Sequence, residues 1–454
     1  MGGISVKKFI GNKEFYITAI SIALPIMLQQ FVTSFVNLID NIMIGSVGSI
    51  ALTSVTVSNR IYLIFNSTLF GLTGAAGIFI AQHYGANNHK NTQKILNINL
   101  VASMLVSLIF IAALIFIPEQ LLNIFSDNPV VIKEGLSYLK YALYAYLPYS
   151  ISMSIMMALR AIGINKIQLG VGIISVITNT TLNYLLIFGH FGFPALGIAG
   201  AAIATSIART IEAIIYIIIL MKHKHYFRLD LDGMLHLDRR MISSMIRKAI
   251  PLSMNEILFS TAMSIIFIAY SKCDESLIPA ISVVDTVMQI AFIIFSGLSS
   301  AVSIMIGNKL GANRIEEAKD NSLKLIAFGI LVGIGISGIV FMVAPFVAKY
   351  YNVESFVKEA IVILLRIKAC LLPAYVYNVC VFFVLRAGGE AFSTLILDSG
   401  FLWLANVLIA VLLSSYFEIS LILLYGIVEC LDVFKLILAS YFYKKGKWLK
   451  NITA

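Results

Sequence analysis

The sequence has little charge. Only 12% of its 454 residues are charged, whereas 59% are hydrophobic and the mean hydropathy is +0.92. A typical soluble domain has roughly 25% charged residues. This shortage excludes an ordinary soluble globular protein, and we predict an integral membrane protein.

Residues suited to catalytic or redox chemistry are scarce or badly spaced. The four cysteines, Cys273, Cys370, Cys380 and Cys430, lie too far apart to indicate a metal-binding motif or a disulfide framework. No P-loop, metal-binding histidine pair or nucleophile motif occurs in the sequence. We therefore expect neither a membrane enzyme nor a pump driven directly by ATP, and we expect no cofactor.

Long apolar segments recur along the chain. A helix needs about 20 apolar residues to cross the hydrocarbon layer of a membrane. The N-terminal segment, "MGGISVKKFIGNKEF", lacks a small-residue cleavage signal, so we expect no cleaved signal peptide. The predicted fold is all-α, with twelve transmembrane helices at residues 15–44, 50–81, 95–118, 131–160, 167–190, 196–221, 246–270, 278–306, 322–347, 356–385, 391–414 and 418–443.

Basic residues are unevenly distributed among the loops. If alternate loops face opposite sides, 19 of the 33 Lys and Arg lie in loops on the side that holds both termini, 2 lie in loops on the other side and 12 lie within the predicted spans. The positive-inside rule then predicts a multi-pass protein of the cell (inner) membrane with both termini in the cytoplasm. The net charge of +10 thus reflects topology and not nucleic-acid binding. The basic stretch around residues 222–245 is interpreted as an interfacial linker, with an anionic-ligand site as the alternative.

The second half of the chain repeats the first at a constant shift in residue number. The segment "FGLTGAAGIFIAQHYGANN" (70–88) recurs as "SGLSSAVSIMIGNKLGANR" (296–314). The same shift lays "ALP" on "AIP", "RAIG" on "RAGG", and Gly200 on Gly426. Pro148 and Pro373 are one position out of step, which indicates a small insertion or deletion within one fourth helix.

Six helices per repeat give both halves the same orientation in the membrane, as in transporters built from parallel repeats. We expect an N-terminal six-helix lobe at residues 1–221, a cytoplasmic basic linker at 222–245 and a C-terminal six-helix lobe at 246–454. Such halves can alternate access to a cavity between them. The alternative is an old duplication without transport activity.

A carboxylate lies near the end of the first predicted helix, in "NLIDNIMIG". Ionisable groups inside a membrane are costly and are therefore functional candidates. The alternative is that the acid, Asp40, reaches the lipid headgroups. Its polar neighbours are spaced three and four residues apart, which predicts one helical face on a water-filled cavity; they are Gln30, Thr33, Ser34, Asn37, Asp40 and Asn41.

Neutral oxygen ligands are available for Asp40. Asn179 and Asn183 are one turn apart in "NTTLNYLLIFG", and Thr205 lies in the next predicted helix. A carboxylate with amide and hydroxyl oxygens suits a hard monovalent cation, or can tune one Asp for protonation. Taken singly, the three neutral residues are equally explained as polar contacts between helices.

The second half carries its own acids inside predicted helices. Glu256 follows Pro251 in the seventh helix, and Asp398 lies in "LILDSGFLWL". Both are candidate cation- or proton-coupling residues, with a structural hydrogen bond as the alternative for Glu256. Asp285, in "SVVDTVMQI", is a candidate for the cavity wall or for structure.

Opposite charges near each other in the sixth and twelfth helices are interpreted as mutually neutralising. Arg209 and Glu212 are three residues apart, and Lys435 follows Glu429 and Asp432. Sulfur and aromatic side chains suit a pocket for apolar cations, although lipid contact also explains them. The candidates are Met153, Met156 and Met157 in the fourth helix, with Tyr375 and Tyr377 in the tenth.

Several of these motifs together resemble the multidrug and toxic compound extrusion (MATE) family. The resemblance covers nearly the whole chain and rests on "NLIDNIMIG", "GANN", "GANR", "NTTLNYLLIFG", "GIAGAAIAT", "PLSMNE" and "RAGGEAFSTLILD". It implies a V-shaped pair of lobes and export of organic cations in exchange for protons or sodium ions. It also implies that the family's helix 1 carboxylate corresponds to Asp40 and its helix 7 glutamate to Glu256.

This sequence departs from the family pattern at two positions. Some members have an Asn and an Asp in helix 5, whereas Asn179 and Asn183 occupy these positions here. Other members have an acid in helix 10, which "CLLPAYVYNVCVFFVL" lacks, so Asp398 is expected to take that part. A monovalent cation would then be held by Asp40, Asn179, Asn183 and Thr205.

The function predicted from the sequence is secondary active multidrug efflux by alternating access. Its partners are small organic cations and the lipid bilayer, and we expect a monomer. The alternative is a flippase for lipid-linked precursors in the same superfamily, which should have a strongly cationic cavity. The acids within the predicted helices argue against it.

Overall fold

The protein is described by a computed structural model that covers residues 9–222, 227–351 and 353–453. Residues 223–226 of the predicted linker lie outside the described residues. Within these ranges every regular element is helical, which confirms the all-α prediction. The main helices are α1 (Lys13–Val47), α2 (Ser49–Gly85), α3 (His89–Phe116), α4 (Pro118–Asn123), α5 (Pro129–Ala142), α6 (Tyr146–Ala161), α7 (Lys166–Phe188), α8 (Gly197–Lys222), α9 (Leu231–Leu235), α10 (Arg239–Cys273), α11 (Ile278–Gly311), α12 (Ile315–Tyr350), α13 (Ser355–Ala387), α14 (Ala391–Leu395), α15 (Leu408–Tyr416) and α16 (Leu421–Lys445).

Eleven helical segments of the described chain are long and apolar enough to cross a membrane. Two of them join shorter helices: α5 with α6 forms Pro129–Ala161, and α14 with α15 forms Ala391–Tyr416. The twelfth predicted span corresponds to α16, which has 25 residues and contains Glu429, Asp432 and Lys435. Its charges, and not its length, set it apart from the other spans.

The chain forms two compact units. Unit 2 contains the described residues of 25–84 and 88–253, and unit 1 contains those of 9–24, 85–87 and 254–453. The boundaries within α1 and α10 fall next to Pro25 and close to Pro251, which are equivalent in the repeat. Both prolines interrupt the hydrogen-bond ladder of a helix. This division differs from the predicted lobes, 1–221 and 246–454, at the N-terminal segment that ends at Leu24 and at the start of α10.

The backbone confirms that the two halves are structural repeats. Asn87 and Asn313 end α2 and α11 in the left-handed conformation, with φ of 56° and 58°. The next residue donates its N–H back to the helix in both, from Asn88 to the His83 carbonyl and from Arg314 to the Lys309 carbonyl, each at 2.9 Å. Asn tolerates positive φ better than most residues, and this bonding pattern is that of a Schellman cap. The "GANN" and "GANR" motifs therefore stop equivalent helices.

Two predicted spans are not regular α-helices. The segment predicted at residues 391–414 contains two π-helical stretches, Ile396–Gly400 and Leu402–Val407, between α14 and α15. The segment predicted at 131–160 is interrupted by a 3₁₀ turn at Leu143–Ala145, just before Pro148. A π-helical turn widens the residue spacing, so side chains in the first segment face directions that a period of 3.6 does not predict.

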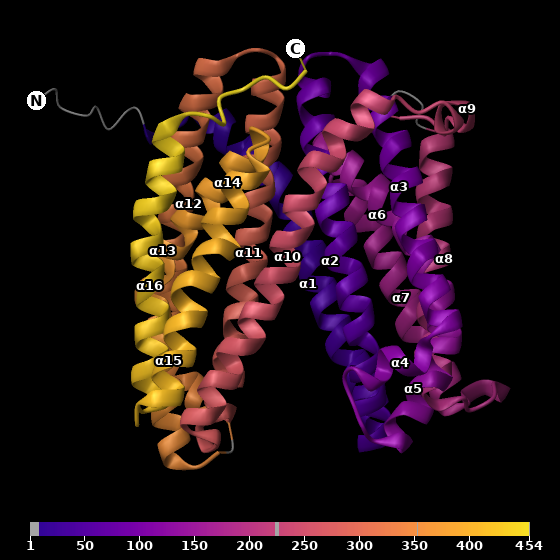
Figure 1. Ribbon diagram of the computed structural model, residues 1–454, viewed down its shortest axis with the longest axis vertical. Helices are drawn as coiled ribbons and strands as arrows, with labels where there is room; N and C mark the ends of the chain where they lie inside the picture. Colours follow the sequence, from indigo (N-terminus) through magenta and orange to yellow (C-terminus); the bar gives the residue numbers. More distant parts are fainter. Residues whose placement is uncertain (1–8, 223–226, 352, 454) are drawn as a thin grey trace, which may run out of the picture. The chain divides into compact units, whose positions relative to one another are not determined.

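The described part of the linker is attached to α3 in unit 2. Asp230 accepts hydrogen bonds from the Gly233 backbone N–H and the Asn97 amide, both at 3.1 Å. These bonds hold the pKa of the Asp230 carboxyl below its usual value. Leu231 and Leu235 are exposed on α9. In Figure 1, α9 and α4 lie at opposite ends of unit 2.

In unit 1, α13 packs along both α12 and α16 (Figure 1). In unit 2, α8 packs against α7, α5 and α6. Small residues allow helix backbones to approach closely in membrane proteins. At Gly200 of α8, an added Cβ would lie 2.4 Å from the Leu186 carbonyl oxygen of α7.

Gly200→Ala should lower the melting temperature, because overpacking of this kind costs about 1–3 kcal/mol. The control is Gly426→Ala at the equivalent position, where an added Cβ would meet only Ile367 Cδ1 at 3.7 Å. This variant should melt at the wild-type temperature or above. Size-exclusion chromatography of heated, detergent-solubilised protein measures both. Equal losses in the two variants would contradict a close approach specific to Gly200.

Candidate cation site

Asp40 lies on the wall of a cavity within unit 2. The cavity has a volume of about 530 Å³ and is lined by residues of α1, α2, α5, α6, α7 and α8. The polar face of α1 reaches it through Gln29, Thr33, Asn37, Asp40 and Asn41. Gln30 and Ser34, the other predicted members of that face, do not line it, and Gln30 is exposed. The cavity-facing stripe therefore begins at Gln29 instead of Gln30.

The predicted neighbours of Asp40 surround its carboxylate. Asn183 donates from Nδ2 to Asp40 Oδ1 at 2.7 Å. With its amide nitrogen turned toward the acid, Asn179 donates to Oδ1 at 3.2 Å and to Oδ2 at 2.9 Å. In this orientation its oxygen accepts from the Thr205 hydroxyl at 3.2 Å. The asparagines named from the sequence as candidate partners of Asp40 thus contact it in the fold.

Asp40 has no basic partner in the part of the chain that the structure describes, although two arginines line the same cavity. Arg209 of α8 forms its ion pair with Glu212 instead, at 2.8 Å, as the sequence predicted. The guanidinium also lies 4.8 Å from the centre of the Tyr149 ring. Among the described residues, the hydrogen bonds to the Asp40 carboxylate therefore come from amides, and Arg209 acts on it only through its charge.

Polar residues on α2 were missed in the sequence. Asn59, Arg60 and Asn66 line the cavity, and Asn66 Oδ1 accepts a hydrogen bond of 2.6 Å from the Tyr149 hydroxyl. Arg60 is the only basic residue of the predicted span 50–81. A charge in such a span signals a functional position, so this residue could have been found.

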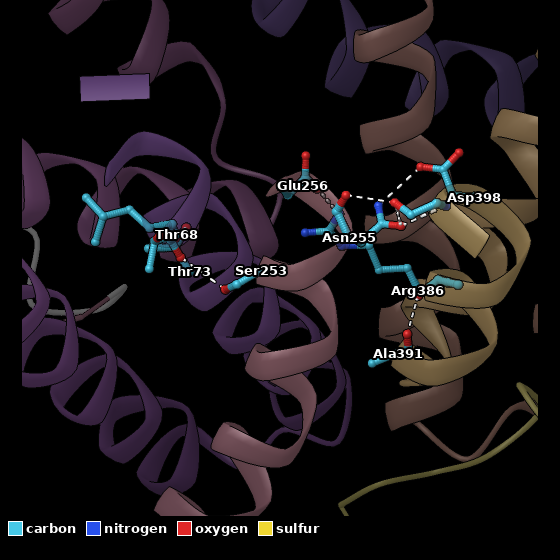
Figure 2. Close-up of polar contacts among 11 residues, drawn as sticks. Thr68, Thr73, Ser253, Asn255, Glu256, Arg386, Ala391 and Asp398 are labelled. Carbon is cyan, nitrogen blue, oxygen red and sulfur yellow. Dashed lines mark hydrogen bonds and ion pairs between the residues drawn. The ribbon is translucent and has the colours of Figure 1, made fainter. Parts of the chain in front are cut away.

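The acids of unit 1 are held differently. Asp398 accepts from Lys435 Nζ at 2.8 Å through Oδ1 and from Asn255 Nδ2 at 3.1 Å through Oδ2. Glu256 lies 3.5 Å from Arg386, measured from Oε1 to Nη1. Figure 2 shows Asn255 of α10 beside Asp398, with Arg386 nearby. Each of these two acids has a basic partner.

The lysine of α16 is not neutralised within its own helix, contrary to the interpretation from the sequence. Lys435 pairs with Asp398, and Glu429 pairs with Lys368 of α13 at 2.5 Å. The π-helical stretch that contains Asp398 explains the difference, because it changes which side chains of that segment face α16. Ser399, the next residue, is buried and donates its hydroxyl to Asn255 Oδ1 at 2.8 Å.

Comparison with known proteins identifies the family. Residues 25–185 and 251–430, more than half of the chain, match the sequence profile of a family described as MatE. The two matches begin at Pro25 and Pro251, which are equivalent in the repeat. The chain belongs to the MATE family of transporters.

Individual relatives are distant but extend over most of the chain. The probable multidrug resistance protein YoeA of Bacillus subtilis is 23% identical over 425 residues, covering 88% of this chain and 91% of that protein. The probable multidrug resistance protein NorM of Thermotoga maritima is 24% identical over 451 residues, covering 95% and 93%. A mutant of the Vibrio cholerae MATE transporter VcmN has the same fold, with a TM-score of 0.86, 17% identity and coverage of 95% and 97%.

The remaining predicted residues of this MATE protein do not line the cavity that contains Asp40. Met153 is buried in α6, and Met157 of the same helix is half-buried. In unit 1, Asp285 is exposed on α11, and Tyr375 packs on Phe292 with ring centres 5.2 Å apart. The Tyr377 hydroxyl lies 2.8 Å from that of Ser440. The prediction that these residues contact substrate therefore gains no support from the Asp40 cavity.

Asp398→Asn should strongly lower the thermal stability of the protein, because it removes the acid that forms the direct ion pair with the mostly buried Lys435 ammonium. Breaking a buried ion pair from one side costs about 3–5 kcal/mol. Asp398→Asn combined with Lys435→Met removes both charges and should recover most of the loss. Melting temperatures of the purified variants measure this. A double variant less stable than Asp398→Asn alone would contradict the pairing.

Proposed function

We propose that this MATE transporter is an antiporter that exports amphipathic organic cations in exchange for protons or sodium ions. The observation that carries the proposal is an acid, Asp40, that lines a cavity and has amide donors but no basic partner among the described residues. A carboxylate in that state attracts any cation that can enter. A proton, a sodium ion and an organic cation then compete for one charge.

The Asn179 amide can match either state of the site. With its nitrogen toward Asp40, it stabilises the ionised acid. With the amide reversed, its oxygen approaches Asp40 Oδ2 to about the same 2.9 Å, which requires a proton or a cation between the two oxygens. Asn183 Oδ1 is buried without a hydrogen-bond partner in the described part of the chain. Oxygens of this kind are the ligands that hard cations prefer.

The rest of the cavity suits an amphipathic cation. Tyr62, Tyr138 and Tyr146 line it together with Val36, Ile44 and Leu139. Aromatic ring faces attract cations, and apolar side chains favour the hydrophobic part of such a ligand. Pockets of about 300–1,000 Å³ accommodate drug-sized molecules, and this cavity falls in that range.

Exchange follows from the shared charge. A ligand shifts a conformational equilibrium only through its different affinities for the two states, so loading of Asp40 must favour one access state over the other. Exchange of one singly charged ion for one singly charged organic cation moves no net charge, so the concentration gradient of the ion drives it, with about 1.4 kcal/mol for each tenfold difference. This energy can drive export when the ion and the organic cation cannot bind together.

The acids of unit 1 take a secondary part in this proposal. Glu256 and Asp398 were predicted coupling residues, but each already has a basic partner. A coupling ion reaches them only when Arg386 or Lys435 moves away. Exchange is therefore assigned to Asp40 first. Asp285, Tyr375 and Tyr377 stay candidates for substrate contact in unit 1.

The flippase alternative is less well supported. A site for an anionic lipid precursor needs a clear excess of positive charge, whereas this cavity has two acids, Asp40 and Glu212, and two arginines, Arg60 and Arg209. The proposal also includes a location in the cell membrane with both termini in the cytoplasm. A monomer suffices, since every residue of the Asp40 site comes from one unit.

Asp40→Asn should abolish ion-driven efflux of a fluorescent organic cation from everted vesicles, because the variant has no charge to exchange. The control is Asp127→Asn, which makes the same substitution in an exposed loop. That variant should transport like the wild type. Undiminished ion-driven efflux by Asp40→Asn would disprove the proposal.

Thr205→Val should distinguish sodium coupling from proton coupling, because valine keeps the shape of threonine but lacks the hydroxyl that could bind sodium. If sodium couples, loss of one ligand should raise the half-maximal sodium concentration by about tenfold. If protons couple, efflux under an imposed pH gradient should change by less than about threefold. Proteoliposomes with separately imposed sodium and pH gradients give both values. If neither a sodium gradient nor a pH gradient drives efflux by the wild type, sodium coupling and proton coupling are both wrong.

A further inference from the structure

The two repeats have a basic residue at the same position, but they use it differently. Arg209 of α8 and Lys435 of α16 are equivalent under the constant shift that relates the repeats. Arg209 pairs at 2.8 Å with Glu212, which lies one turn further along the same helix. Lys435 pairs at 2.8 Å with Asp398, which lies on another segment. Asp40 in one repeat thus has no basic ion-pair partner among the described residues, whereas Asp398 in the other repeat has one.

Arg209 is close enough to Asp40 in the fold to compete for it. Thr205, whose hydroxyl bonds to the Asn179 side chain, lies one turn before Arg209 on α8. Residues with this spacing share a helical face and are about 6 Å apart along the axis. Asp40, Arg209 and Glu212 all line the same cavity. A long, flexible arginine at that position can reach the acid if nothing else holds it.

Glu212 is well placed to hold the arginine. Its Oε2 accepts from Arg209 Nη1 at 2.8 Å and from the Ser175 hydroxyl of α7 at 3.0 Å. Glu212 is only 7% exposed. Ser175 is one turn before Asn179 on α7, so the same two helices that surround Asp40 also fix Glu212. The Tyr149 ring, 4.8 Å from the guanidinium, adds a cation–π contact on this side.

We propose that Glu212 is a positioning residue that keeps Arg209 paired with itself and so leaves Asp40 open to the coupling ion. Without Glu212, Arg209 pairs with Asp40, as Lys435 pairs with Asp398 in the other repeat. A tethered guanidinium makes a strong ion pair with a carboxylate, and an ion from solution must then displace it. In this proposal Glu212 itself does not bind the coupling ion. This inference rests on the proposed exchange at Asp40.

The test is a set of variants measured for ion-driven efflux in proteoliposomes. Glu212→Gln should lower the rate by about tenfold or more, because Arg209 then occupies Asp40. Adding Arg209→Gln to Glu212→Gln should restore most of the rate, since the competing cation is gone. The charge-matched control adds Arg60→Gln instead. Arg60 also lines the cavity but makes no ion pair with Glu212, so this variant should stay impaired.

A second comparison does not depend on the folding of Glu212→Gln, in which a buried arginine loses its acid. Arg209→Gln is compared with the double variant Arg209→Gln/Glu212→Gln, and neither contains that arginine. The two should agree within about threefold, because Glu212 has nothing left to position. A double variant about tenfold slower than Arg209→Gln would show that Glu212 has a role of its own and overturn the inference.

The outcomes also separate this inference from the function on which it rests. Asp40→Asn is measured beside the other variants. If the wild type shows no ion-driven efflux, or Asp40→Asn keeps it, the proposed exchange at Asp40 is wrong. If both behave as proposed but Glu212→Gln is as fast as the wild type, or if Arg60→Gln restores it as well as Arg209→Gln, only the role of Glu212 is wrong.

Discussion

A charge within hydrocarbon needs a partner, because transfer of an isolated ion from water into a medium of low dielectric constant is far more costly than transfer of a paired one. The helices of this protein meet that need mostly with direct ion pairs. Asp40 is treated differently, since two asparagine amides replace a basic side chain. Ion pairs within the described helices include Arg209–Glu212, Lys368–Glu429, Arg386–Glu256 and Lys435–Asp398.

The two asparagine amides leave the Asp40 carboxylate in a state between a permanent ion pair and a permanently protonated acid. A basic partner would satisfy the carboxylate permanently, and an apolar surrounding would keep it protonated. Amide donors stabilise the ionised form without cancelling its charge, so a mobile cation still gains energy by binding. In the proposed function, the tyrosines and apolar side chains of the same cavity restrict which larger cations fit. Transport follows if the loaded and empty states prefer different access.

The sequence was sufficient to predict features that depend on local residue patterns or on the repeat. Apolar length predicted the helices, and the constant shift between the repeats aligned Asn87 with Asn313, which end equivalent helices in the structure. Helical spacing placed Asn179 and Asn183 on one face, the family resemblance paired that face with Asp40, and the structure shows the contact.

The failures have a common geometric cause. The partner of Lys435 was missed, because the π-helical turns around Asp398 break the helical period on which such reasoning depends. The sequence pattern also placed Gln30 on the cavity-facing side of the first helix, whereas Gln29 lines the cavity in the structure. Adjacent residues differ by about 100° around a helix, so an error of one position moves the predicted face.

The central claim is that a coupling ion and an organic cation share the Asp40 carboxylate. The most direct measurement is ion release when a fluorescent organic cation binds to purified, detergent-solubilised protein in weak buffer, followed with proton and sodium electrodes. The account predicts release of about one proton or sodium ion per bound cation in the wild type, and none in Asp40→Asn. Binding of the organic cation to the wild type without release of either ion would contradict it.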